Sequence, residues 1–280
     1  MSSDKELAKL RKKIDDLDDR LVQLISERAS CASEVAEVKQ GMEDTVYYRP
    51  EREAQVLRRI MEQNPGPLGD EEMARLFREV MSACLALEEP TKVAYLGPEG
   101  TFTQAAALKH FGHSSVTQPQ STIEQVFREV EAGACHYGVV PVENSTEGIV
   151  THTLDSFINS GLRICGEVEL RIHHNLMIGK NTQESGITRV YSHAQSLAQC
   201  RRWLDANYPS IEKVAVSSNA EAARRVQTEW NSAAIAGDIA SELYDLNIIA
   251  ENIEDHPDNS TRFLVIGSVD VGPSGKDKTS

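Results

Sequence analysis

The N-terminal stretch of the chain has apolar residues at intervals of three and four positions, the spacing of one face of an amphipathic helix. No Gly or Pro interrupts this pattern before Gly41, and its apolar members are Leu7, Leu10, Ile14, Leu17, Leu21, Leu24, Cys31, Val35 and Val38. The pattern predicts one helix from Asp4 to Gln40, roughly 55 Å long at ~1.5 Å per residue. Because an apolar stripe of this length needs a partner along all of it, we expect a homodimer formed through this helix.

Two further helices are predicted after it. Pro50 is well placed to open a helix that ends near Gln63, because Pro is favoured in the first helical turn. A turn rich in Gly and Pro follows, and Asp70 can cap a third helix from Glu71 to Glu88. The sequence therefore predicts an all-helical domain over residues 1–90.

Beyond this region the pattern changes to short β-rich runs that alternate with helical segments, which is typical of α/β units around mainly parallel sheets. About ten such strands in roughly 180 residues indicate two small lobes around a cleft. We place the α/β domain at residues 91–268, with one lobe at 91–172 and 260–268, the other at 173–259, and a linker at 269–280. The expected strands are Val93–Leu96, Ser115–Pro119, Tyr137–Pro141, Ile164–Leu170, Leu176–Ile178, Arg189–Ser192, Lys213–Ser217, Ala233–Ala236, Ile248–Ala250 and Phe263–Ile266.

The composition excludes several classes of partner and site. A net charge of −14 and a pI near 5.1 argue against nucleic acid and against an anionic membrane surface as general partners. The N-terminus lacks the apolar core of a signal peptide and no apolar run is long enough to span a bilayer, so we expect a cytoplasmic protein. The five cysteines are spread without a CxxC pair, which indicates neither a disulfide framework nor a zinc site.

A group of charged residues on the predicted helices stands out in so acidic a chain and could bind a small dicarboxylate. Arg28 and Lys39 are eleven residues apart, so they return to nearly the same helix face. Arg11 lies about 25 Å from them along the axis, so only an antiparallel partner could bring its Arg11 to the same site. Spacing alone also allows ordinary surface cations, but Arg28 interrupts the apolar stripe, where an unpaired charge is costly. The further candidates of this group are Arg49, Arg52, Glu53, Cys84 and Glu88.

Polar turns follow several expected strands, at the sheet edge where α/β clefts usually bind ligands. The segment Glu143–Gly148 precedes a helix, so its hydroxyls and N–H groups could bind a carboxylate there or simply cap the helix. Two later turns, Ser192–Gln195 and Ser218–Glu221, repeat the arrangement. The turn Gly97–Gly100 lacks the GK[ST] of a P-loop, so no nucleotide is expected. The candidate binding residues of these turns are Asn144, Ser145, Thr146, Ser192, Gln195, Ser218 and Asn219.

Several long motifs, in order along the chain, resemble a known enzyme family. The helical region resembles the chorismate mutase domain at the N-terminus of bifunctional P-proteins, in LAKLRKKIDDLDDRLVQLISERASCASEVAEVK, YRPEREAQVL and LFREVMSACLALE. The remainder resembles prephenate dehydratase, in VAYLGPEGTFTQAAAL, GVVPVENSTEGIVTHTLDSF, HHNLMI, VYSHAQSLAQCRRWL, SSNAEAARRV and AAIAGDIASELYDLNIIAENIEDHPDNSTRF. The resemblance covers nearly all of residues 5–267 and implies an intertwined dimer of three-helix mutase domains, followed by dehydratase lobes similar to type II periplasmic binding proteins. It implies an enzyme of phenylalanine biosynthesis that needs no metal or organic cofactor.

The resemblance also implies roles for the mutase candidates, whose reaction is a pericyclic rearrangement of chorismate to prephenate. Arg11 of one subunit, with Arg28 and Arg52 of the other, would bind the two carboxylates of chorismate. Lys39 would contact the ether oxygen, and Glu53 would hold the ring hydroxyl. Catalysis then depends on holding a compact conformer and on stabilising the charge that develops at the breaking ether bond.

Three further positions complete this implied site, and two of them depart from the family pattern. The backbone at Arg49 would assist in binding the ring hydroxyl. Cys84 stands where a serine can occur, and Glu88 stands where some members have glutamine. Because only a protonated Glu88 can donate to the ether oxygen, we predict that mutase activity falls as the pH rises and Glu88 loses its proton. The substitution Glu88→Gln is expected to flatten this dependence.

The turn before the last expected strand carries Thr-Arg-Phe, which is the dehydratase signature. The resemblance implies that Thr261 assists departure of the ring hydroxyl of prephenate, directly or through water, while carbon dioxide leaves and the ring becomes aromatic. Arg262 and Phe263 would be substrate contacts. The sequence equally allows Arg262 to brace the turn.

Alternatives remain open from the sequence. Two α/β lobes around a cleft also describe small-anion binding or sensor modules, in which the helices would form only a dimerisation arm. The dehydratase could also act on arogenate, the amino analogue of prephenate, and dimers could pair into tetramers. P-proteins normally continue into an ACT domain with GAL and ESRP motifs, and neither motif occurs here. We therefore expect insensitivity to phenylalanine unless a longer chain was shortened.

Overall fold

The structure is a computed structural model that describes residues 2–39 and 48–275. It divides into two compact units, which we call the helical unit and the α/β unit. The helical unit contains the described residues up to 91 together with 111–115 and 273–275, and the α/β unit contains 92–110 and 116–272. Within the described ranges, no helix is long and apolar enough to cross a membrane.

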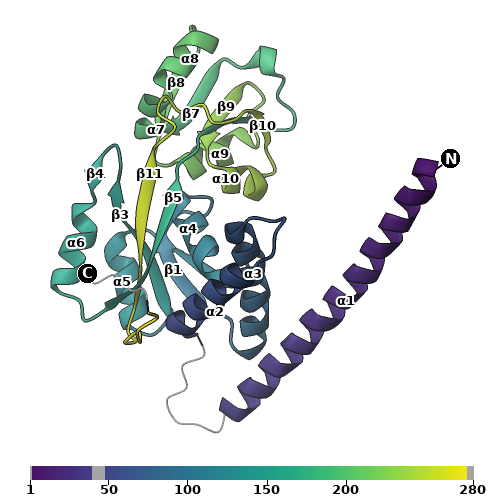
Figure 1. Cartoon of the computed structure of the whole chain (residues 1–280). Coiled ribbons are helices and arrows are strands. Elements are labelled where there is room, and N and C mark those ends of the chain that lie inside the picture. Colours follow the sequence, from purple (N-terminus) through teal and green to yellow (C-terminus); the bar gives the residue numbers. More distant parts are fainter. Residues whose placement is uncertain (1, 40–47, 276–280) are drawn as a thin grey trace. The chain divides into compact units, whose positions relative to one another are not determined.

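The helical unit is built from three helices, α1 (Ser2–Lys39), α2 (Pro50–Gln63) and α3 (Asp70–Glu88) (Figure 1). α2 begins at Pro50 as predicted, whereas the predicted end of the first helix at Gln40 lies outside the described residues. The predicted cap of α3 is wrong, because Gly69 occupies the N-cap position and no side chain caps the helix. The Asp70 carboxylate instead accepts a hydrogen bond from Asn64 Nδ2 at 2.8 Å, across the preceding turn.

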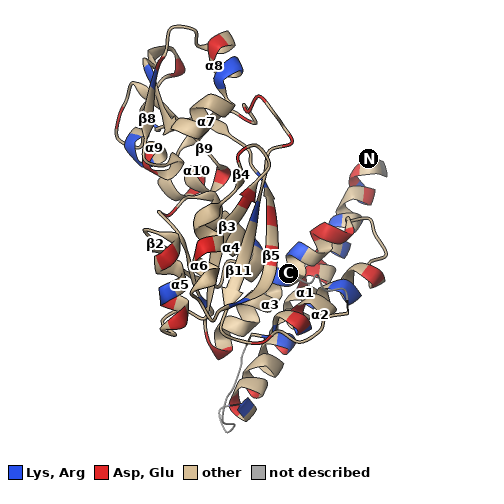
Figure 2. Cartoon of the chain, turned by 90° about the vertical axis from the view of Figure 1, so that its left-hand side faces the viewer, with Lys and Arg blue, Asp and Glu red and all other residues tan. Residues whose placement is uncertain are grey.

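The apolar stripe of α1 is exposed in the single chain. Charged residues of both signs occupy the rest of the helix surface (Figure 2). The C-terminal end of α1 lies against α3, where Ala36 is 7% exposed and Lys39 Nζ lies 3.5 Å from Glu88 Oε2. Among the described residues, a long apolar surface is thus left uncovered, and its members expose between 43% and 57%: Leu7, Leu10, Ile14, Leu17, Leu21 and Leu24.

The first lobe of the α/β unit is a mixed sheet in the order β2-β1-β3-β11-β5, with the short β4 beside β3. β1 is parallel to β2 and β3, but β11 is antiparallel to both of its neighbours. α5 packs on this sheet through Ile123, Val126, Phe127 and Val130, which recur at helical spacing and are all buried. The elements are β1 (Lys92–Leu96), α4 (Phe102–Phe111), β2 (Val116–Gln120), α5 (Ile123–Glu131), β3 (Tyr137–Asn144), β4 (Gly148–Ile149), α6 (Thr151–Ile158), β5 (Arg163–Arg171) and β11 (Ser260–Gly267).

The second lobe is a five-stranded mixed sheet in the order β10-β6-β9-β7-β8. Successive residues of β6 and β9 point to opposite faces, so two apolar clusters form. Met177 and Ala234 pack with residues of α9 and α10, while Leu176 and Ala233 pack with Leu204 of α8. Helices therefore cover both faces of the central strand. The elements are β6 (Asn175–Ile178), the 3-10 helix Glu184–Gly186, β7 (Arg189–His193), α7 (Ala194–Gln199), α8 (Arg201–Asn207), β8 (Glu212–Val216), α9 (Asn219–Val226), β9 (Ser232–Ala236), α10 (Asp238–Tyr244) and β10 (Asn247–Ala250).

The predicted fold class, a helical N-terminal region followed by a two-lobed α/β domain, is confirmed, but the expectation of mainly parallel sheets is wrong. β11 returns antiparallel between β3 and β5 after the whole second lobe, and β6 is antiparallel to β9 and β10. The segment Glu143–Gly148 does not lead directly into a helix either, because β3 continues to Asn144 and β4 pairs back onto it. Gly148 has a φ of 84°, which residues with a side chain rarely adopt, and α6 starts beyond it at Thr151.

Candidate active sites

A pocket of about 530 Å³ lies in the helical unit, lined by residues of α1, α2 and α3. The predicted site residues that line it are Arg28, Arg49, Arg52, Glu53, Cys84 and Glu88. Arg11 and Lys39 are not among its lining residues in the described part of the single chain, although Lys39 reaches Glu88 from the end of α1. The structure therefore brings together most of the residues that the sequence singled out in this region.

This first pocket is cationic. Its lining contains four arginines against two carboxylates, in a chain whose net charge is −14. Such a local excess of positive charge suits a small dianion. Arg59 is one of the four and was not predicted. It lies two helical turns after Arg52, so the two share a face of α2, and this spacing could have identified it.

Glu53 is held in the first pocket by Arg78 of α3 and by Tyr48, which lies just before α2. Its Oε1 lies 3.4 Å from Arg78 Nε, and its side chain is 16% exposed. Burial raises the pKa of Glu53, and the charge of Arg78 and a hydrogen bond from the Tyr48 hydroxyl partly oppose this rise. Tyr48 packs against Phe111, with ring centroids 5.4 Å apart. The carboxylate is therefore fixed in place and suited to accept a hydrogen bond from a ligand hydroxyl.

A second pocket, of about 280 Å³, lies in the α/β unit and is lined by residues of both lobes. The predicted site residues that line it are Asn144, Gln195, Ser218, Asn219 and Thr261. The predicted residues that do not line it are Ser145, Thr146, Ser192, Arg262 and Phe263. Residues from distant parts of the sequence thus meet here, because β3 ends at this pocket, β11 begins there, and the turns before α7 and α9 border it.

The second pocket contains no Asp, Glu, Lys or Arg among its described lining residues. Instead, two of the longer helices begin at its wall: Thr101 and Phe102 lie at the start of α4, and Ser218 and Asn219 at the start of α9. Helix N-termini carry partial positive charge and free N–H groups, so they attract anions without a cationic side chain. The pocket therefore suits an anionic ligand.

Ser192 is fully buried and lies behind the second pocket. Its Oγ lies 2.7 Å from the Ile235 carbonyl oxygen and 2.8 Å from Asn219 Oδ1. The Asn219 Oδ1 also accepts a hydrogen bond from the His193 N–H at 3.1 Å. Ser192 therefore fixes the side chain of Asn219, which does line the pocket.

Thr261 and Asn144 are cross-strand neighbours on β11 and β3, which explains why their side chains meet. Asn144 Oδ1 accepts hydrogen bonds from the N–H groups of Thr146 and Glu147, at 3.0 and 3.2 Å. Its Nδ2 must then face the other way, where it donates to Thr261 Oγ1 at 2.7 Å. Since the Thr261 oxygen already accepts this bond and Thr261 lines the pocket, its own proton is available to a ligand.

Arg262 follows Thr261 in the strand and therefore points to the opposite face. Its guanidinium pairs with Glu143 Oε2 at 2.6 Å and with Glu167 Oε1 at 3.0 Å. These partners raise the pKa of Arg262 and tie β11 to β3 and β5. The contacts fit the bracing role that the sequence left open. Phe263 is 1% exposed and packs in the core.

Two family descriptions match the chain, chorismate mutase type II over residues 10–89 and prephenate dehydratase over residues 93–270. Proteins named bifunctional chorismate mutase/prephenate dehydratase from Stutzerimonas stutzeri and Pseudomonas aeruginosa are 66% and 65% identical to it over 284 residues. These matches cover 100% of this chain and 78% of each relative. The chain belongs to the bifunctional chorismate mutase/prephenate dehydratase family.

The α/β part of this family member also resembles a solved structure. The prephenate dehydratase from Arthrobacter aurescens, in complex with L-Phe, is 33% identical and superposes with a TM-score of 0.61. The match covers 68% of this chain and 63% of that chain. The first pocket thus lies largely among residues of the mutase match and the second among residues of the dehydratase match.

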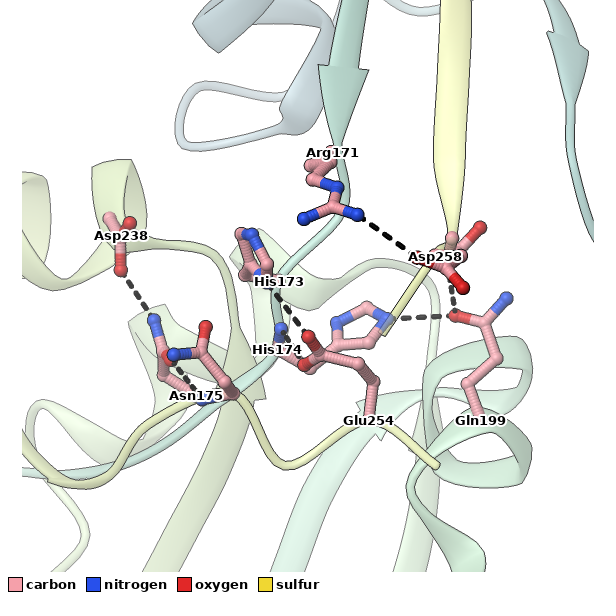
Figure 3. Close-up of polar contacts among 10 residues, drawn as sticks. Arg171, His173, His174, Asn175, Gln199, Asp238, Glu254 and Asp258 are labelled. Carbon is pink, nitrogen blue, oxygen red and sulfur yellow. Dashed lines mark hydrogen bonds and ion pairs between the residues drawn. The ribbon is translucent and has the colours of Figure 1, made fainter. Parts of the chain in front are cut away.

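The sequence did not single out several polar residues of the dehydratase pocket, and three of them form one hydrogen-bonded group. His174, Gln199 and Asn259 all line the pocket and are joined by hydrogen bonds. Figure 3 shows the bond between His174 and Gln199. Each lies inside a motif that carried the resemblance, HHNLMI, VYSHAQSLAQCRRWL and the stretch that ends in NSTRF. The motifs were therefore a signal for them, but only the fold shows that the three side chains meet.

Proposed function

We propose that this chain catalyses both reactions of its family name. Chorismate would rearrange to prephenate in the pocket of the helical unit, and prephenate would lose water and carbon dioxide to give phenylpyruvate in the pocket of the α/β unit. One observation supports the proposal most directly. Each of the two regions that match a family contains its own polar pocket, lined by candidate residues from that region. A cytoplasmic location and a role in phenylalanine biosynthesis belong to the same proposal.

In the mutase pocket, the side chains would bind and shape the substrate without forming a covalent bond to it. Arg28 and Arg52 would bind the carboxylates of chorismate, and Glu53 would accept a hydrogen bond from the ring hydroxyl. Lys39 and a protonated Glu88 would donate to the ether oxygen, where negative charge develops as the carbon–oxygen bond breaks. Lys39 Nζ donates to Glu88 Oε2 at 3.5 Å, so the two side chains reach the same part of the helical unit. Arg49 and Cys84 would complete the pocket wall.

A second copy of the chain would complete the mutase pocket. The uncovered apolar stripe of α1 needs a partner along its whole length, and a second copy of the same helix, in an antiparallel arrangement, would cover it. Such a partner would bring its Arg11 to the pocket that Arg28 lines, which accounts for the absence of Arg11 from the pocket lining in the described single chain. Pairing of dimers into tetramers stays a prediction of the sequence.

In the dehydratase pocket, Thr261 would donate its hydroxyl proton to the ring hydroxyl of prephenate as the carbon–oxygen bond breaks. The electron pair of the bond to the ring carboxylate would move into the ring, carbon dioxide would leave, and the ring would become aromatic. Solvent would return the proton to Thr261. The starts of α4 and α9, with Ser218, Asn219 and Gln195, would hold the carboxylates. Thr146, which donates to Asn144 Oδ1, would support the Asn144 amide, and Ser145, which donates to Asn259 Oδ1 at 3.3 Å, would support Asn259.

A single incubation of the purified chain with chorismate tests the proposal. Prephenate should appear first and phenylpyruvate after it. Accumulation of prephenate alone would contradict the dehydratase assignment, and a parallel incubation with arogenate would show whether that substrate is used instead. Unchanged chorismate, together with prephenate that is bound but not converted, would favour the small-anion binding module.

A further inference from the structure

His174 lies in the wall of the dehydratase pocket, and the chemistry proposed above gives it no role. It is 1% exposed, and its ring meets Phe102 edge-on with ring centroids 5.7 Å apart. Glu254 fixes the backbone that carries this ring: its Oε2 accepts from the backbone N–H of His174 at 2.9 Å, and its Oε1 lies 2.8 Å from His173 Nδ1 (Figure 3). Burying a polar ring costs free energy, because the ring loses its hydrogen bonds to water. Hydrogen bonds within the protein must therefore compensate for the burial of His174.

The hydrogen bonds of Gln199 determine which nitrogen of His174 carries the proton. Nε2 of His174 lies 2.8 Å from Gln199 Oε1, and Gln199 Nε2 donates to Thr146 Oγ1 at 3.1 Å. Because an amide oxygen can only accept, His174 must carry its proton on Nε2. Its Nδ1 is buried without a hydrogen-bond partner among the described residues. Burial lowers the pKa of His174, which keeps the ring neutral at neutral pH.

Two routes of hydrogen bonds lead from Gln199 to Thr261, and both pass through Asn144. In the first, Asn259 Nδ2 donates to Gln199 Oε1 at 3.3 Å, and Asn144 Nδ2 donates to Asn259 Oδ1 at 3.2 Å. In the second, the Thr146 hydroxyl, which accepts from Gln199, donates to Asn144 Oδ1 at 2.6 Å. If the Gln199 amide turned over, its NH₂ would face the donors of His174 and Asn259, and both routes would break.

We propose that His174 is a positioning residue of the dehydratase reaction, whose Nε2–H holds the Gln199 amide in the orientation that keeps Asn144 directed at Thr261. This inference rests on the dehydratase function proposed above. His174 acts through Gln199 and Asn144 and touches no reacting atom. Its loss therefore weakens proton donation by Thr261 in the transition state more than it weakens substrate binding, so kcat falls while KM changes little.

Three variants of the full chain test this role. His174→Leu removes the N–H group at similar size, His174→Gln keeps a donor near the position of Nε2, and Gln199→Leu breaks the next link. We expect the dehydratase kcat to fall about 10-fold in His174→Leu with KM changed less than about twofold, and to recover largely in His174→Gln. A fourth variant that combines His174→Leu with Gln199→Leu should be no slower than Gln199→Leu alone, because both changes remove the same link. Mutase turnover and thermal unfolding of the same samples report intact folding.

Several results would overturn the role. A wild-type kcat in His174→Leu would do so, as would losses that add in the double variant. Equal losses in the Leu and Gln variants would show that His174 only fills space. Should His174→Leu unfold, His174→Asn replaces it, since its amide falls near Nδ1, and activity equal to that of His174→Gln would contradict the proposal. A wild-type chain that converts no prephenate would contradict the proposed function itself.

Discussion

The two pockets suit anionic ligands by different physical means. The pocket of the helical unit surrounds its ligand space with arginines on helix surfaces, whereas the pocket of the α/β unit has amides, hydroxyls and helix N-termini and no charged Asp, Glu, Lys or Arg among its described lining residues. Charges act over several ångströms and tolerate movement, while neutral hydrogen bonds need fixed geometry. A charged site can therefore be shared between two chains, but a site of neutral hydrogen bonds is best built within one.

The largest expected effect tests whether the pocket of the α/β unit catalyses the dehydratase reaction independently of the mutase reaction. Thr261→Val keeps the shape of the side chain but removes the proton donor, so we expect dehydratase kcat to fall by about 1000-fold while mutase turnover is unchanged. Steady-state assays with each substrate measure both. Thr261→Ser retains the hydroxyl and is the matched control. Full dehydratase activity in the valine variant would refute the assignment of Thr261.

The next effect tests whether the pocket of the helical unit is completed by residues of a second chain. Arg11→Ala and Arg28→Ala should each lower mutase kcat/KM by about 100-fold, because each removes a bond to a substrate carboxylate. If the two residues come from different chains, random mixing of the two variants regenerates about a quarter of the sites in intact form. Mutase assays after the variants are unfolded and refolded together measure this recovery. Activity that stays at the level of the separate variants would exclude a shared site.

A smaller effect concerns a proton in the charged pocket. Glu88 can donate to the ether oxygen only in its protonated form, so we expect mutase kcat/KM to be higher in acid than in alkali. Glu88→Gln donates at every pH, so the variant should lose most of this dependence. The measurement is a pH profile of both forms from the acidic to the mildly alkaline range, with dehydratase turnover as the control. Parallel profiles would sink the assignment.

The smallest effect concerns Arg262, which the contacts place as a brace. Arg262→Gln should lower the free energy of unfolding by about 1 kcal/mol or less, because the pairs with Glu143 and Glu167 are partly open to solvent. Dehydratase KM should change less than about threefold, since Arg262 is not among the described residues that line the pocket. Denaturant unfolding and steady-state kinetics measure the two quantities. A KM raised 10-fold or more would show instead that Arg262 binds a substrate carboxylate.

The sequence predicts most of the local structure because local signals are strong at particular residues. Pro50 opens α2 as expected, and the alternation of apolar residues locates nearly all the strands. The cap at Asp70 was wrong because a side chain six positions away, Asn64, competes for its carboxylate. The short β4 was missed because two exposed residues give no periodic pattern.

Long-range pairing explains what the sequence could not predict. Nothing in the residues of β11 indicates that this strand returns antiparallel between β3 and β5, and the expectation of mainly parallel sheets failed there. The same pairing makes Thr261 and Asn144 neighbours. The motifs assigned both residues to one site only through their resemblance to a known family. The sequence did not single out His174, Gln199 and Asn259, because their role depends on side chains that meet only after folding.

The place of β11 also sets an order of events during synthesis. β11 follows the other described strands in the sequence, yet it lies between β3 and β5, so the first lobe cannot complete its sheet until residues 260–267 have left the ribosome. The three helices of the N-terminal region are available long before that. Thr261 arrives with β11, so a chain whose translation stops before that strand has the N-terminal helices but lacks Thr261.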